Sequence, residues 1–167
     1  PAAGFWQAGA VTAPAEPAAA TALFEGTLAR FSALAVLLPL ILGQSRITGA
    51  QSLAVALRGL FLGEVQPRQW LSIAGKEFAA GLVNGAVVAL VAAGGVYLWS
   101  ASTGLATVAA LAVLFSMLVA AVTGALVPLA LRGLGRNPAR ASTLLFTTLA
   151  DVVGIFAFLG FAAAMLQ

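Results

Sequence analysis

Residues 141–166 read ASTLLFTTLADVVGIFAFLGFAAAML, and this stretch decides the fold of the chain. A helix of about 20 apolar residues crosses the hydrocarbon core of a bilayer, so the run predicts a transmembrane helix. One carboxylate, Asp151, lies near its middle. An acid at that depth costs about 2.5–3.5 kcal/mol on insertion scales and normally faces a partner or a water-filled path. Asp151 is therefore the first candidate for a functional residue.

Two hydroxyl side chains precede Asp151 by about one helical turn. Thr147 and Thr148 lie four and three residues before it, which places all three side chains near one face of a helix. A carboxylate beside two hydroxyls, with no Lys or His within the span, favours a cation site. The alternative is an ion pair with an arginine from another helix, and Arg46 makes that possible.

The composition excludes an ordinary soluble domain. Hydrophobic residues make up 62% of the 167 residues and charged residues 8%, whereas soluble domains contain about 25% charged residues. The formal net charge of +3 comes from eight basic residues spread along the chain. Such a distribution is a topology signal and offers no basic patch for nucleic acid. We therefore predict an all-α integral membrane protein in contact with the lipid bilayer.

The chain contains no cysteine and no histidine. Disulfides, thiolate metal sites, imidazole ligation of haem or zinc, and histidine-based catalysis are excluded accordingly. A membrane enzyme that uses acidic side chains for catalysis needs two of them at the same depth in the bilayer. Asp151 is the only acid in the middle of a predicted span. We expect neither an enzyme nor an organic cofactor.

Three apolar runs predict unbroken spans, at residues 78–99, 105–131 and 141–166. A further run, residues 28–62, contains the polar segment QSRITG at 44–49, and Pro39, Gly43 and Gly49 favour a broken helix. Polar backbone at membrane depth is tolerated where it lines a cavity or is buried in protein, so the predicted break indicates a pathway.

Residues 1–24 form the weakest segment, because they are rich in alanine but include Gln7, Glu16 and prolines. They are either a first span with a proline kink or an interfacial arm. Residues 25–167 contain the remaining helices, and no repeat or low-complexity linker divides the chain. We therefore expect one transmembrane domain over residues 1–167, a bundle of four to five helices.

The basic residues predict the orientation of the bundle. Six of the eight fall in two regions that an alternating topology places on the same side: Arg58, Arg68 and Lys76, and then Arg132, Arg136 and Arg140. The positive-inside rule assigns that side to the cytoplasm. The C-terminus then lies outside.

Several segments also match a known family in order and spacing. They are Leu23-Phe-Glu-Gly-Thr-Leu-Ala29, Pro39 with Gly43, Gln51-Ser-Leu, Arg58-Gly-Leu-Phe-Leu-Gly-Glu64, Lys76-Glu77, Leu82-Val-Asn-Gly85, Gly124-Ala-Leu-Val-Pro128, Pro138-Ala and Thr147-Thr-Leu-Ala-Asp-Val-Val-Gly154. In this order they resemble the transmembrane domain of the MgtE family of magnesium channels and its solute-carrier relatives, from about Leu23 to the C-terminus.

The resemblance implies a homodimer of five-helix subunits in a bacterial inner (cytoplasmic) membrane, with the second and fifth helices lining a central pore. It implies a divalent-cation channel or transporter with Mg²⁺ as the transported ion. Asp151 of each subunit then faces the ion, with Thr147 and Thr148 beside its water shell, since Mg²⁺ gives up water reluctantly. Glu25, near the outer end of the first span, and Asn137, at the cytoplasmic mouth, complete the candidate metal-site residues.

Four positions depart from the family's pattern. Arg46 and Ile47 replace a glycine and an asparagine in the second helix, Ser116 replaces an asparagine, and Asn137 replaces an acid. Each change weakens the attraction for a cation. A second function therefore stays open: a non-conducting structural or regulatory subunit of a larger membrane complex, in which Arg46 neutralises Asp151.

Overall fold

A computed structural model describes residues 32–166, which form four long helices and one short 3-10 turn. The elements in chain order are α3 (Ser32–Leu62), η1 (Pro67–Gln69), α4 (Trp70–Ser100), α5 (Thr103–Gly133) and α6 (Pro138–Met165). The described residues contain no strand. The prediction of an all-α membrane bundle is confirmed, and residues 1–24 and Glu25 lie outside the described part of the chain.

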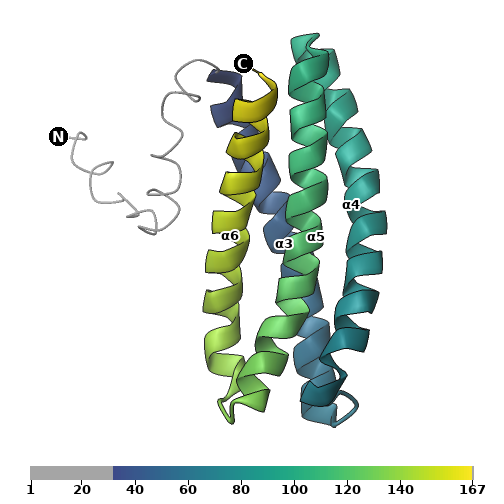
Figure 1. Ribbon diagram of the computed structural model, residues 1–167, viewed down its shortest axis with the longest axis vertical. Coiled ribbons are helices and arrows are strands. Elements are labelled where there is room, and N and C mark those ends of the chain that lie inside the picture. Colours follow the sequence, from purple (N-terminus) through teal and green to yellow (C-terminus); the bar gives the residue numbers. More distant parts are fainter. Residues whose placement is uncertain (1–31, 167) are drawn as a thin grey trace, which may run out of the picture.

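Successive long helices run in opposite directions (Figure 1). The connections at residues 63–69 and 134–137 lie at one end of the bundle, and the tight reversal at residues 101–102 lies at the other end, beside the C-terminus. The two basic regions therefore share one end of the molecule, as the alternating topology requires.

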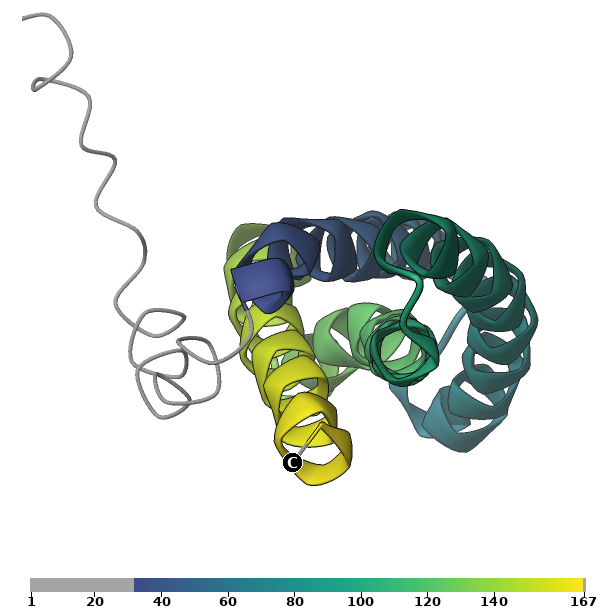
Figure 2. The same cartoon turned by 90° about the horizontal axis from the view of Figure 1, so that it is seen from above.

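Helix α5 lies at the centre, and α3, α4 and α6 surround it in an arc (Figure 2). It contributes more buried residues than any other described helix, and many of them are alanine or glycine. Small residues let neighbouring backbones approach closely in a membrane, where packing rather than water exclusion drives helix association. The composition of α5 thus explains its position against three neighbours.

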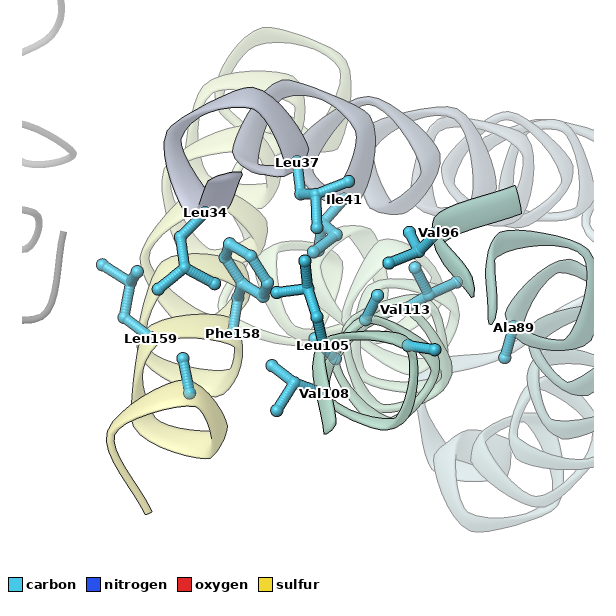
Figure 3. Close-up of a cluster of buried hydrophobic side chains, with 14 of the residues drawn as sticks. Leu34, Leu37, Ile41, Ala89, Val96, Leu105, Val108, Val113, Phe158 and Leu159 are labelled. Carbon is cyan, nitrogen blue, oxygen red and sulfur yellow. The ribbon is translucent and has the colours of Figure 1, made fainter. Parts of the chain in front are cut away.

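The largest apolar cluster occupies the half of the bundle near the C-terminus (Figure 3). Leu34 and Ile41 of α3 meet Leu105 and Val108 of α5 and Phe158 of α6 there, and all five side chains are buried. No charged side chain belongs to this cluster among the described residues. The polar groups that matter for function lie elsewhere in the bundle.

The predicted break in the second helix is wrong, because α3 continues without interruption through Pro39, Gly43 and Gly49. Gly49 instead serves close packing against α5. A Cβ atom added at Gly124 would lie 2.3 Å from the carbonyl oxygen of Gly49, so the two backbones touch at this point. Glycine is required there for contact, and a continuous helix keeps every one of its remaining backbone hydrogen bonds internal.

Three of the described helices are long and apolar enough to cross a membrane: residues 67–100, 103–133 and 142–165. They correspond to the three spans predicted from the sequence. Helix α3 has a matching length of 31 residues but carries the polar segment at 44–49 in its middle. Ser45, Thr48 and Ser52 of α3 are buried against neighbouring helices, and Arg46 reaches α6 to form the candidate site.

Candidate functional site

Asp151 forms a two-point ion pair with Arg46 of α3. The Nε group of Arg46 donates to Oδ1 of Asp151 at 2.6 Å, and Nη2 donates to Oδ2 at 2.5 Å. This side-by-side geometry is the strongest arrangement of a guanidinium and a carboxylate. The pair is the alternative that the sequence left open, and it is the only ion pair among the side chains that the structure describes.

The positions of the two partners within their helices place the pair deep in the bundle. Asp151 is the fourteenth residue of α6, about 20 Å along the axis from its first residue. Arg46 is the fifteenth residue of α3. The contact between Gly49 and Gly124 lies one turn further along α3 and holds this helix against the centre of the bundle.

The two partners differ in their exposure. The side chain of Asp151 is 4% exposed, whereas that of Arg46 is 50% exposed. The carboxylate is therefore enclosed by protein and depends on the guanidinium for its compensation. The guanidinium has a second side that protein does not cover. A cation approaching this place meets a neutral pair rather than a free negative charge.

Thr147 and Thr148 are half-buried and precede Asp151 on α6. The hydroxyl of Thr147 donates to the carbonyl oxygens of Thr143 and Leu144, both at 3.0 Å. Its proton is used within its own helix, so this oxygen can only accept further hydrogen bonds. Its lone pairs can receive bonds from the water shell of an ion, as the sequence interpretation requires.

Asn137 lies far from this group. It is the N-cap of α6, where its side-chain oxygen accepts a hydrogen bond from the backbone N–H of Ala139 at 3.0 Å. Fourteen residues of helix separate it from Asp151, a distance of about 21 Å along the axis. The structure thus brings Thr147, Thr148 and Asp151 together on one helix and leaves Asn137 at the end of the bundle.

Two serines near Asp151 add buried hydroxyls. Ser45 is fully buried and donates to the carbonyl oxygen of Leu42 at 3.0 Å. Ser116 of α5 is 3% exposed, and its hydroxyl has no hydrogen-bond partner among the described residues. Both hydroxyls lie within 4 Å of the position that a Cβ would take at Gly154, one turn after Asp151. Ser45 was not singled out by its sequence, since a lone serine beside an arginine carries no recognisable signal.

A second polar contact joins α3 to α4. Ser52 donates its hydroxyl proton to Oε2 of Glu77 at 2.6 Å. The sequence did not predict this contact. The missed signal was the spacing of polar residues on α3, where Thr48, Gln51 and Ser52 share one face.

Comparison with known proteins supports the assignment of the fold. The MgtE family, described as divalent cation transporters, matches residues 38–161. This stretch contains the whole of α4 and α5 together with Arg46 and Asp151.

Curated relatives carry the same family name. The magnesium transporter MgtE of Bacillus subtilis is 32% identical over 144 residues, which cover 86% of this chain and 32% of that protein. The magnesium transporters MgtE of Thermus thermophilus and Enterococcus faecalis are each 33% identical over 144 residues, with the same coverage. The chain therefore spans about a third of the length of these relatives. All three are named as transporters and not as enzymes.

Proposed function

This chain belongs to the MgtE family, and we propose that it is the membrane domain of a divalent-cation channel or transporter that carries Mg²⁺. The observation that carries the proposal is the enclosed carboxylate of Asp151, halfway along α6 and inside the segment that matches the family. Carboxylate and hydroxyl oxygens suit Mg²⁺, which keeps several of its waters when it binds. Thr147 and Thr148 supply hydroxyls beside the same carboxylate.

We further propose a homodimer in which α3 and α6 face the partner subunit. Asp151 of each subunit then contributes one negative charge to a single divalent ion on the two-fold axis. The half-exposed side chain of Arg46 leaves surface on α3 that such a partner could cover. Glu25, which matches the family and lies outside the described residues, is proposed to assist the ion at the outer side.

The charged loops support an orientation for the domain. Both basic regions lie at one end of the bundle, and basic loops remain on the cytoplasmic side of a membrane. The domain is thus proposed to lie in a bacterial inner membrane with its C-terminus outside. Asn137, at the cytoplasmic end, takes the position of the pore mouth.

Arg46 gives the proposed pathway a closed state. While both carboxylate oxygens accept from the guanidinium, its positive charge neutralises Asp151 and opposes the approach of an ion. Conduction therefore requires Arg46 to leave Asp151. A movement of this kind exchanges one strong interaction of Asp151 for another, because the arriving divalent ion replaces the lost positive charge.

The same ion pair supports a second candidate function. In a non-conducting structural or regulatory subunit, the Arg46–Asp151 pair is permanent and holds α3 on α6. Asn137 and Ser116, which stand where the family pattern has an acid and an asparagine, agree with this alternative. The two functions differ in whether the pair ever opens.

Mg²⁺ influx into proteoliposomes, measured with an enclosed Mg²⁺-sensitive dye, tests the proposal. The parent chain is compared with Asp151→Asn, Arg46→Gly and the control Arg58→Gly, which removes another exposed arginine from α3. Circular dichroism and size-exclusion chromatography verify that each variant is folded.

Three results are informative. Flux in the parent and in Arg58→Gly that disappears in Asp151→Asn supports transport through the Asp151 site. Flux that is absent in the parent and appears in Arg46→Gly supports a transport domain closed by its own arginine. Folded protein that conducts in none of the variants contradicts transport and leaves the non-conducting subunit as the function.

A further inference from the structure

A polar cavity lies between α3 and α4, away from the Arg46–Asp151 pair. Its volume is about 170 Å³, and α5 closes it from behind through Ala121. The remaining residues that line it are Thr48, Gln51, Ser52, Val55, Glu77, Ala80, Gly81 and Asn84. Five of these residues carry a side-chain oxygen that can bind a cation: Thr48, Gln51, Ser52, Glu77 and Asn84. The composition of this lining differs sharply from the apolar grooves elsewhere on the bundle.

The cavity results from a matched spacing on two helices. The lining residues of α3 begin at Thr48 and those of α4 at Glu77, and each set follows at positions three, four and seven residues later. This is the repeat that places side chains on one face of a helix. Arg46 and Thr48 are separated by about 200° around α3, so the cavity and the ion pair lie on opposite faces of that helix.

Small residues keep the cavity open. A Cβ atom added at Gly81 would lie 2.9 Å from the Cβ of Ala121, so α4 touches α5 directly behind the cavity. Gly81 and Ala80 fill little of the space in front of this contact. The polar side chains of α3 and α4 therefore face each other across a gap that no large side chain occupies.

The oxygen atoms in the cavity remain able to accept. Ser52 donates to one oxygen of Glu77, which leaves the other carboxylate oxygen and the serine lone pairs available. Thr48 donates to the carbonyl of Gln44 at 3.0 Å, so its oxygen likewise can only accept. Gln51 and Asn84 add amide carbonyls. One carboxylate with hydroxyl and amide oxygens is the ligand set of a hard cation such as Mg²⁺.

Charge and position agree with this chemistry. Among the side chains that the structure describes, Glu77 makes no ion pair, so its negative charge lacks a protein cation. It lies seven residues into α4, about 10 Å from the end of the bundle that carries the basic loops. Asn84 lies about 10 Å deeper on the same face. The cavity therefore leads inward from the boundary of the membrane.

We propose that this cavity is a second divalent-cation site, in which Glu77 is the charged ligand and Ser52 orients it. A water molecule occupies about 30 Å³ of liquid volume, so the cavity holds an ion with several of its waters. Mg²⁺ keeps such waters and binds through one or two carboxylates. The choice of a divalent ion rests on the proposed function, whereas the site itself rests on the geometry of α3 and α4.

Binding of Mn²⁺ to the purified chain in detergent micelles tests the site. Electron paramagnetic resonance counts free and bound Mn²⁺, and the Asp151→Asn variant serves as the background so that the carboxylate of Asp151 contributes nothing. In this background Glu77→Gln is expected to weaken binding by at least about tenfold, since loss of even an outer-shell partner of a metal costs that much. Glu64→Gln is the matched control, because it removes an exposed acid at the same end of the bundle. Added Mg²⁺ is expected to displace the Mn²⁺.

A second variant protects the test from misfolding. Ala80→Leu fills the cavity and leaves Glu77 in place, and it is expected to weaken Mn²⁺ binding as well. Unchanged Mn²⁺ binding in folded Glu77→Gln, or an equal loss in Glu64→Gln, overturns the proposal. Mn²⁺ binding is measured independently of Mg²⁺ flux. A chain that does not transport Mg²⁺ can therefore still bind at Glu77, and loss of the Glu77 site does not contradict transport.

Discussion

A carboxylate lies against each of two opposite faces of α3, and the protein treats the two differently. On one face Asp151 is matched by a full guanidinium through two charge-assisted hydrogen bonds. On the other face Glu77 receives one bond from the neutral hydroxyl of Ser52 and borders an open polar cavity. The first acid is neutralised within the protein, whereas the second keeps its charge available.

This difference predicts how the fold responds when each acid loses its charge or its partner. A buried pair in which one partner is removed leaves an uncompensated charge, and that is severely destabilising. An acid that is half-buried beside a cavity can lose its charge with little effect on the fold, because water reaches it. Changes on the Asp151 face should therefore lower stability, whereas changes on the Glu77 face should alter cation binding with little loss of stability.

The largest effect is expected for Arg46→Gln. The enclosed carboxylate of Asp151 then loses its counter-charge, which should lower the unfolding free energy by about 3 kcal/mol, the lower end of the range for buried pairs because Arg46 is half-exposed. Asp151→Asn should cost less, since the guanidinium it leaves behind reaches water or headgroups. Denaturant titration in detergent micelles measures both. An equal loss in the two variants would show that Asp151 is not the partner in need of compensation.

A smaller loss is expected for Gly124→Ala, which acts on both faces through the position of α3. The added methyl collides with the carbonyl of Gly49, and such overpacking costs about 1–3 kcal/mol. Gly43→Ala on α3 is the control, because no atom lies within 4 Å of its Cβ position and alanine favours a helix. Thermal unfolding in micelles compares them. A stable Gly124→Ala would contradict the contact between α3 and α5.

Ser52→Ala is expected to have a modest effect on stability, about 1 kcal/mol, because one hydrogen bond to a half-buried carboxylate is lost. The double variant Ser52→Ala with Glu77→Gln should be little less stable than Ser52→Ala alone, because both changes act on the same hydrogen bond. A double-mutant cycle in denaturant titrations measures the coupling. Additive losses would show that Ser52 and Glu77 do not interact. Ser72→Ala on α4 is the control, because it removes an exposed hydroxyl.

The smallest effect is expected for Asn137→Asp, which touches neither face of α3. Aspartate retains the N-cap of α6 and adds a negative charge at the helix N-terminus, which should stabilise by about 0.3 kcal/mol. Combined with Asp151→Asn, the two changes should be additive, because about 21 Å of helix separates them. Coupling between them in thermal unfolding would mean that the end of the bundle communicates with the ion pair.

Much of the fold could be predicted from the sequence. The three apolar runs became α4, α5 and α6, and the two basic regions lie at one end of the bundle. The predicted break in α3 failed because Pro39 and Gly49 were taken as helix breakers. Glycine marks both flexible points and close contacts, and only the neighbouring Gly124 shows which applies here.

The site was predictable in part. Asp151 stood out because an acid within an apolar run needs a partner, and Arg46 was the partner that the sequence offered. The contact between Ser52 and Glu77 was missed, because the two residues are 25 positions apart in the sequence with a helix reversal between them. Each helix revealed a polar face, but nothing in one sequence indicates that the two faces meet.

The uninterrupted course of α3 has a mechanical consequence. Because a continuous helix turns as a rigid body, a rotation that releases Arg46 from Asp151 also moves Thr48 and Ser52 against α4. The two proposed sites are then thermodynamically linked: the factor by which an ion at Glu77 changes the affinity of Asp151 for its ion equals the factor by which an ion at Asp151 changes the affinity of Glu77. The uninterrupted α3 thus couples its Asp151 face to its Glu77 face.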